Sequence, residues 1–149
     1  MVRQIALAVL TGMTVTTVPL RAECIGTTIP NQKRTAARVF EALVTTIEPL
    51  EHGEFEATLH VHQVWKGDAP TETIVYFTSS FDGPSLERGK RYIFFVVPLS
   101  PVARKAYGLP PDHPPRSNWV PPCSGLALPV DSTVKQLGRS RKPNDRHVP

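Results

Sequence analysis

Apolar and polar residues alternate along the middle of this chain with the two-residue period of a β-strand. The clearest stretch lies between residues 55 and 62. Its apolar face is formed by Phe55, Ala57, Leu59 and Val61, and its polar face by Glu56, Thr58, His60 and His62. A strand with one buried and one solvated face is therefore predicted here.

Three further ranges are predicted to form strands. Residues 38–47 are rich in β-branched side chains and partly apolar on both faces, and residues 73–78 form a shorter run of the same kind. Residues 91–97 are apolar on both faces, which predicts the most buried strand. The breaks between strands contain turn residues and lie at 48–54, 66–70 and 88–90.

The sequence changes character between residues 98 and 122, which hold eight of the sixteen prolines of the chain. Proline has no N–H to donate to a strand ladder, so a long loop is predicted. A short strand is predicted at residues 126–130. Asp131 is a suitable N-cap for a helix over residues 132–137, and Gly138 is a suitable end.

Five short strands followed by a small helix are typical of an all-β domain. We expect a five-stranded OB-type Greek-key barrel with a short C-terminal helix, in which closure of the sheet removes its exposed edges. A β-sandwich is the alternative. This domain covers residues 23–138, and the polar, basic residues 139–149 are expected to form a disordered tail because they show no apolar pattern.

Residues 1–22 have the features of a secretory signal peptide. A basic start with Arg3 precedes an uncharged apolar stretch over residues 5–20, and Ala22 ends a suitable cleavage site. The stretch is too short and too rich in threonine for a lasting membrane span, and a retained anchor is the alternative. We therefore expect a secreted or periplasmic protein.

Two cysteines, Cys24 and Cys123, bracket nearly all of the chain that follows the signal. In an oxidising compartment an isolated pair of cysteines is most simply a disulfide. Two free thiols or a metal pair are the alternative, but the sequence lacks the CxxC spacing that favours a metal.

The charge of the chain gives little support to binding of nucleic acid or of an anionic membrane. Its 17 basic and 13 acidic residues leave a small excess, and Arg3 and Arg21 are removed with the signal. The basic turn at 88–91 and the basic tail would be the contacts in a nucleic-acid complex. Export argues against that hypothesis, and we expect neither nucleic acid nor stable membrane insertion.

The sequence shows no motif that groups residues for catalysis. Ser124 lacks the Gly-x-Ser-x-Gly frame of an exposed nucleophile, Ser79-Ser80 fits the end of a strand, and a phosphate-binding glycine loop is missing. We expect a non-enzymatic protein without a cofactor.

His60 and His62 share one face of their predicted strand with Glu56 and are weak candidates for a metal site. Two ligands at this spacing are more simply part of a solvated strand face. The sequence offers no partner to the remaining histidines, which lie in predicted loops or in the tail: His52, His113 and His147.

The proline-rich segment carries the residues that we expect to bind a partner, namely Tyr107, Leu109 and Trp119. OB-type barrels make contacts through one strand face and the loops beside it, and prolines lower the entropy cost of presenting a loop. In the alternative, the segment is a spacer whose Trp119 packs back onto the barrel near Cys123.

Several short motifs resemble a known family. They are residues 37–44 (ARVFEALV), 64–67 (VWKG), 86–95 (LERGKRYIFF), 123–125 (CSG) and 137–138 (LG). Together they look like a bacterial secreted domain that is similar to the tissue inhibitors of metalloproteinases and the netrin-like modules. The resemblance spans Cys24 to Gly138.

The resemblance implies an OB-fold barrel with a disulfide at its N-terminal cysteine, and an interaction module whose partner is another exported protein. In the metalloproteinase inhibitors, the free amine of the first cysteine binds the zinc of the protease. Only Cys24 corresponds to it, and a mature chain that begins at Glu23 would turn that amine into an amide. The alternatives are a divergent metalloprotease inhibitor and a small periplasmic metal-binding protein that uses His60 and His62.

Overall fold

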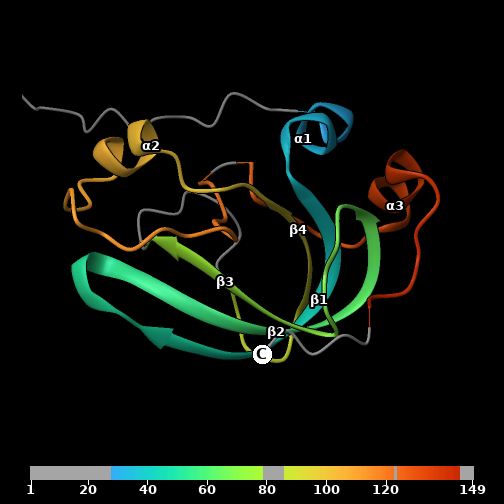
Figure 1. Ribbon diagram of the computed structural model, residues 1–149. Coiled ribbons are helices and arrows are strands. Elements are labelled where there is room, and N and C mark those ends of the chain that lie inside the picture. The colour runs from blue at the N-terminus through green and yellow to red at the C-terminus, as the bar shows by residue number, and fades with distance from the viewer. Residues whose placement is uncertain (1–27, 79–85, 123, 145–149) are drawn as a thin grey trace, which may run out of the picture.

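The computed structural model describes residues 28–78, 86–122 and 124–144, and its backbone is drawn in Figure 1. The expected signal peptide, Cys24, Cys123 and the expected disulfide between them lie outside the described residues. The elements are α1 (Ile29–Thr35), β1 (Arg38–Pro49), a 3₁₀ turn (Glu51–Gly53), β2 (Glu54–Lys66), β3 (Glu72–Thr78), β4 (Arg91–Val96), α2 (Pro101–Ala106), β5 (Leu126–Ala127) and α3 (Asp131–Leu137).

The strands form one five-stranded sheet in the order β3-β2-β1-β4-β5, and every neighbouring pair is antiparallel. The prediction of a mostly β fold is confirmed. Hairpins join β1 to β2 and β2 to β3, and β4 returns to the free side of β1, which is the Greek-key order 4-1-2-3. β5 ends earlier than predicted, because Pro129 has no N–H for the ladder.

The sheet is not closed into a barrel, and the backbone around Trp119 is what links β3 to the end of β4. Trp119 makes a parallel bridge to Tyr76 of β3 and an antiparallel bridge to Val97, which follows β4. The Trp119 and Val97 N–H groups each donate to the other residue's carbonyl at 2.9 Å. This segment therefore covers part of the β3 edge without a continuous ladder.

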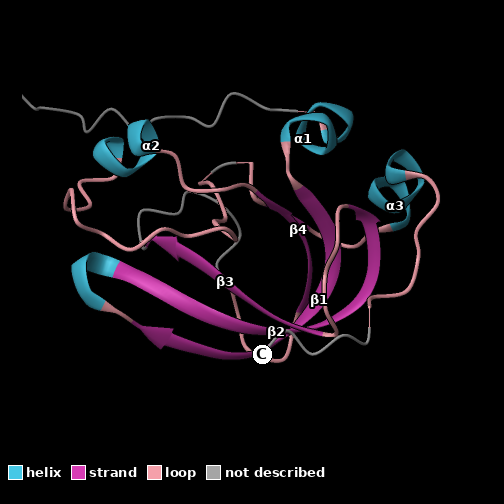
Figure 2. Cartoon of the chain, viewed as in Figure 1, coloured by secondary structure: helices cyan, strands magenta, loops and turns pink. Residues whose placement is uncertain are grey.

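Apolar side chains are buried on both faces of the sheet. The larger cluster includes Phe40 and Phe94, whose rings stack with centroids 5.6 Å apart. The opposite face buries a smaller cluster under α1 and α3, which lie beside each other in Figure 2 while α2 lies at the other end of the molecule. There the Trp65 indole donates to the Gly138 carbonyl at 3.1 Å, and Lys33 donates to the Leu137 carbonyl at 2.6 Å.

Two helices were not predicted from the sequence, and both begin with a proline in the first turn. Proline suits that position because its missing N–H has no partner within the helix there. In α2, the Ser100 side chain accepts a hydrogen bond from the Ala103 N–H at 3.1 Å and caps the helix. The segment 98–122 is therefore not a continuous loop. The predicted C-terminal helix is present as α3, with Val130 rather than Asp131 at the N-cap.

Residues 139–144, expected as part of a disordered tail, make backbone hydrogen bonds to the body of the protein. Arg141 exchanges two backbone hydrogen bonds with Val64 of β2, and Asn144 makes backbone hydrogen bonds to Ala69 and Thr71. Backbone pairing of this kind needs no apolar pattern, which is why composition did not reveal it. Residues 145–149 lie outside the described part. No helix among the described residues is long and apolar enough to cross a membrane.

We expect Trp119→Ala to lower the free energy of unfolding by about 3–5 kcal/mol, because the side chain is 1% exposed and its removal leaves a large cavity. Trp119→Phe should cost less, since the indole N–H has no partner among the described residues. Chemical denaturation measures both, with Val102→Ala as the control at an 81% exposed position. Equal stabilities of Trp119→Ala and the wild type would contradict the role given to this residue.

Candidate interaction site

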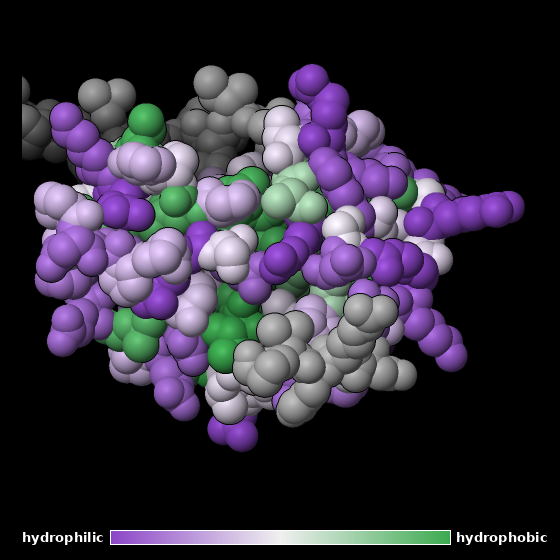
Figure 3. Space-filling model, viewed as in Figure 1, coloured by the Kyte–Doolittle hydropathy of each residue, from purple (hydrophilic) through white to green (hydrophobic). Residues whose placement is uncertain are grey.

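A cleft of about 490 Å³ opens between the turn that joins β1 to β2 and the proline-rich segment that follows α2. Figure 3 shows hydrophilic side chains over most of the face viewed, with hydrophobic patches between them. The cleft is lined by Leu50, Glu51, His52, Glu54, Pro110, Asp112, His113, Pro114 and Arg116.

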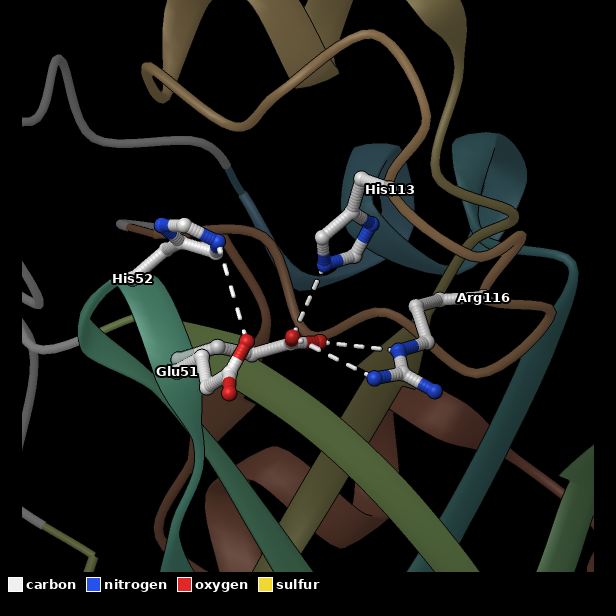
Figure 4. Close-up of polar contacts among 5 residues, drawn as sticks. Glu51, His52, His113 and Arg116 are labelled. Atoms are coloured by element: carbon white, nitrogen blue, oxygen red, sulfur yellow. Dashed lines mark hydrogen bonds and ion pairs between the residues drawn. The ribbon is translucent and has the colours of Figure 1, made fainter.

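Glu54 lies at the base of this cleft as the first residue of β2, and it is only 3% exposed. Its carboxylate accepts a hydrogen bond from Nε2 of His113 at 2.8 Å, and from Nε and a terminal nitrogen of Arg116 at 2.9 and 3.3 Å (Figure 4). The contact with Arg116 is therefore bidentate. Because an unpaired buried carboxylate is costly, these hydrogen bonds offset the burial of Glu54.

Arg116 is held on two sides. Its guanidinium lies over the Tyr76 ring, 3.9 Å from the centroid, in a cation–π contact. Burial alone would lower the pKa of Arg116, but the hydrogen bond and the negative charge of Glu54 outweigh it and raise that pKa above its usual value. The guanidinium thus stays charged and fixes the segment around residue 116 to β2 and β3.

His113 fastens the same segment at a second point. Its side chain is 3% exposed, and Nε2–H donates to Glu54. The other ring nitrogen, Nδ1, is buried and has no partner among the described residues. Neither nitrogen is therefore open to a molecule that enters the cleft.

The rim of the cleft is formed by the 3₁₀ turn. His52 has a φ of 57°, in the left-handed region that residues other than glycine rarely adopt, and Gly53 follows with a φ of 72°. The His52 ring lies 3.9 Å from the Glu51 carboxylate, and both side chains are exposed. Figure 4 shows Glu51 and His52 together on one side of the site, away from Arg116.

The three residues expected to bind a partner pack into the protein instead of lining the cleft. The Tyr107 ring stacks on Trp119 with centroids 5.4 Å apart, and Leu109 is 6% exposed in the same small cluster. The Trp119 side chain is thus packed against the body of the protein and is 1% exposed. A direct contact of Trp119 with a partner would require the indole to leave this site.

His60 and His62 lie together on the outer face of β2, with ring centroids 5.2 Å apart. Their neighbours on this face include Glu41 and Arg91, whose charged groups are 3.6 Å apart. Glu56, the third residue of the metal hypothesis, is the cross-strand partner of Tyr76. In the described ranges, no three His, Cys, Asp or Glu side chains are grouped in a way that could hold a metal ion.

Several basic residues considered for nucleic acid are paired with carboxylates. Lys90 lies 2.7 Å from Glu87, and Arg91 lies 3.6 Å from Glu41. In the C-terminal segment, Arg141 lies 2.8 Å from Asp68. The positive charges of Lys90, Arg91 and Arg141 are therefore partly compensated by neighbouring carboxylates.

Sequence reasoning missed the residues that form the base of the cleft. His113 was placed in a loop without a partner, and Glu54 was treated as part of a turn. The contact joins positions 59 residues apart, so no local spacing could have revealed it. No protein-family model matches this chain, and no curated protein matches it. The likeness to inhibitor-like domains therefore depends on the short motifs alone.

We expect Glu54→Gln to lower the free energy of unfolding by about 3 kcal/mol, because it removes the charge that compensates a largely buried guanidinium. Glu87→Gln is the matched control. It breaks the ion pair of Glu87 with Lys90, in which the two side chains are 55% and 58% exposed, and should therefore cost much less. Urea denaturation at neutral pH measures both, and equal losses would contradict the structural importance of Glu54.

The pKa of His62 should lie below its ordinary value, because burial and then the charges of Arg91 and His60 disfavour the imidazolium, with Glu41 acting in the opposite direction. The unfolded chain then binds more protons than the folded chain just below pH 6.5, so His62 lowers stability as the pH falls through that window. Titration followed by NMR should show Arg91→Gln raising this pKa and Glu41→Gln lowering it further. A shift of the same sign in both variants would contradict the assignment.

Proposed function

We propose that this protein is an exported, non-enzymatic interaction module that binds another exported protein at the rim of the cleft. The observation that carries the proposal is the fastening of the proline-rich segment to β2 by Glu54, His113 and Arg116. This network holds the two walls of the cleft in one position. A surface that is ordered before binding loses little entropy when a partner docks, which favours affinity.

The same network supports binding over catalysis. A general acid or base must reach the proton that it transfers within hydrogen-bond distance. The His113 imidazole has one nitrogen committed to Glu54 and the other buried. The Arg116 guanidinium is likewise committed to Glu54 and to the Tyr76 ring. These groups hold the site together, and the parts of the cleft open to a ligand are its rim.

The chemistry of the rim indicates the kind of surface that fits it. Glu51 has a side chain that is 94% exposed, and Asp112 is also exposed. The charge of Glu54 below them is compensated by Arg116. A partner that places a lysine or arginine between Leu50 and Pro110 would meet two carboxylates and apolar walls.

We also propose that the fold is a partly open barrel of the OB type. The Greek-key order of β1 to β4 supports this proposal, because the OB fold is a partly open Greek-key barrel. The bridges of Trp119 to Tyr76 of β3 and to Val97 after β4 also support it, because they connect strands that are not neighbours in the sheet. The likeness of the sequence to inhibitor-like secreted domains points to the same architecture.

Cross-linking from the rim tests the binding function. A photoactivatable residue in place of Leu50, which is 37% exposed, should give a discrete adduct with an exported protein of the native host, whereas the same residue in place of the 81% exposed Val102 on α2 should not. The adduct from position 50 should weaken when Glu51→Gln and Asp112→Asn are added. Identical adducts from positions 50 and 102, or none from 50, would overturn the proposal.

Export and the disulfide are tested by the intact mass of the protein recovered outside the cytoplasm, alkylated with and without prior reduction. We expect a chain that begins at Glu23 and in which Cys24 and Cys123 react only after reduction. A chain that begins at Cys24 would instead present a free cysteine amine, which would favour the metalloprotease inhibitor over the module proposed here.

A further inference from the structure

The C-terminal segment, residues 139–144, lies along an edge of the sheet that no strand covers. β3 pairs with β2 only as far as His60, where the partner is Glu72. Beyond that point β2 continues to Lys66, so its later residues have an open side. Arg141 pairs with Val64 on that side in antiparallel fashion, with N–H to carbonyl distances of 2.8 and 2.9 Å.

The following residues extend this pairing along the connection from β2 to β3. The Asn144 N–H donates to the Ala69 carbonyl at 3.1 Å, and the Thr71 N–H donates to the Asn144 carbonyl at 3.3 Å. Arg141 and Asn144 thus satisfy four backbone groups of the sheet edge and its connection. Extended peptides are bound in this way when they add a strand to an exposed edge.

Side chains at the edge recognise particular positions of the segment. The Arg141 guanidinium donates to the Gly67 carbonyl and to the Asp68 carboxylate, the latter at 2.8 Å. The Asn144 amide reaches the same carboxylate at 3.4 Å, and the Ser140 hydroxyl donates to the Gln63 side chain at 3.0 Å. The edge therefore recognises the side chain of Arg141 and, three positions later, that of Asn144.

Residues 139–144 are held against the edge of the sheet with little burial of their side chains. Residues 139–142 are exposed, and residues 143 and 144 are only half buried. The ion pair of Arg141 with Asp68 joins side chains that are 49% and 76% exposed, and such pairs contribute little. A segment held by a few backbone hydrogen bonds and exposed polar contacts opens at low cost in free energy.

We propose that this edge, formed by Gln63, Val64 and residues 67–71, is a peptide-binding site that the protein's own C-terminal segment occupies. Its ligand is an extended, basic segment of another protein, with arginine opposite Asp68 and asparagine three residues further on. The protein's own segment competes at the high effective concentration that covalent attachment gives, so it keeps the site closed to weak ligands. The site is separate from the cleft, and its test is independent of the proposed function.

The test uses the full chain and a fluorescent synthetic peptide with the sequence of residues 139–144. Arg141→Pro removes both the backbone donor to Val64 and the guanidinium, which releases the segment from the edge. Fluorescence anisotropy should then show the peptide binding about tenfold or more tightly to this variant than to the wild type, because the attached competitor is gone. A peptide with alanine at the Arg141 position should bind more weakly, as should the original peptide to Arg141→Pro combined with Asp68→Asn.

Two further variants keep the test decisive. Arg141→Glu places a carboxylate beside Asp68 and should expose the site without introducing proline, should Arg141→Pro fail to fold. Lys142→Glu makes a comparable charge change one residue further along and should leave peptide binding as weak as in the wild type. Equal binding to all variants, or no binding to folded Arg141→Glu, would overturn the proposal. Concentration-dependent dimers of the wild type that Arg141→Glu abolishes would also overturn it, since the occupant would then be a second copy.

Discussion

The pairing of Glu54 with Arg116 connects the regular part of this molecule to its irregular part. Glu54 begins β2, and Arg116 lies 62 residues later in the segment that follows α2. That same segment continues to Trp119, whose backbone bridges β3 and the end of β4. Since a buried carboxylate is costly without its paired guanidinium, the path of the segment depends on this contact, and so does the link between β3 and the end of β4.

The strands could be predicted from the sequence because their side chains alternate with the period of a sheet. Ala57, Leu59 and Val61 are buried as the pattern indicates, while His60 on the opposite face is exposed. The proline-rich segment was harder to interpret, because proline is compatible both with a loop and with the first turn of a helix. For this reason α2 was not predicted from the sequence. Trp119 was predicted to contact a partner at the surface, whereas its side chain is buried in the core.

The base of the cleft lay beyond sequence reasoning for a physical reason. Each member looks ordinary in its local context, since Glu54 follows a turn and His113 stands among prolines. Only the folded arrangement removes water from both and makes their hydrogen bond strong. The segment 139–144 was missed for the opposite reason. It has no apolar pattern because backbone groups, which are the same in every sequence, hold it to the sheet.

Two arginine–carboxylate pairs in this protein differ in burial, and this difference determines what each contact can do. Arg116 meets Glu54 where the carboxylate side chain is 3% exposed, and Arg141 meets Asp68 where the carboxylate side chain is 76% exposed. Water competes little with the first pair and strongly with the second, so the first can fix a wall of the cleft while the second can open. A hydrogen bond from Arg141, followed by its charge, lowers the pKa of Asp68. When Arg141 leaves, this lowering is lost, but an exposed aspartate is still ionised at neutral pH and can pair with another arginine. The exposed pair is thus suited to an exchange of partners, because another chain can supply the same backbone hydrogen bonds and the same arginine.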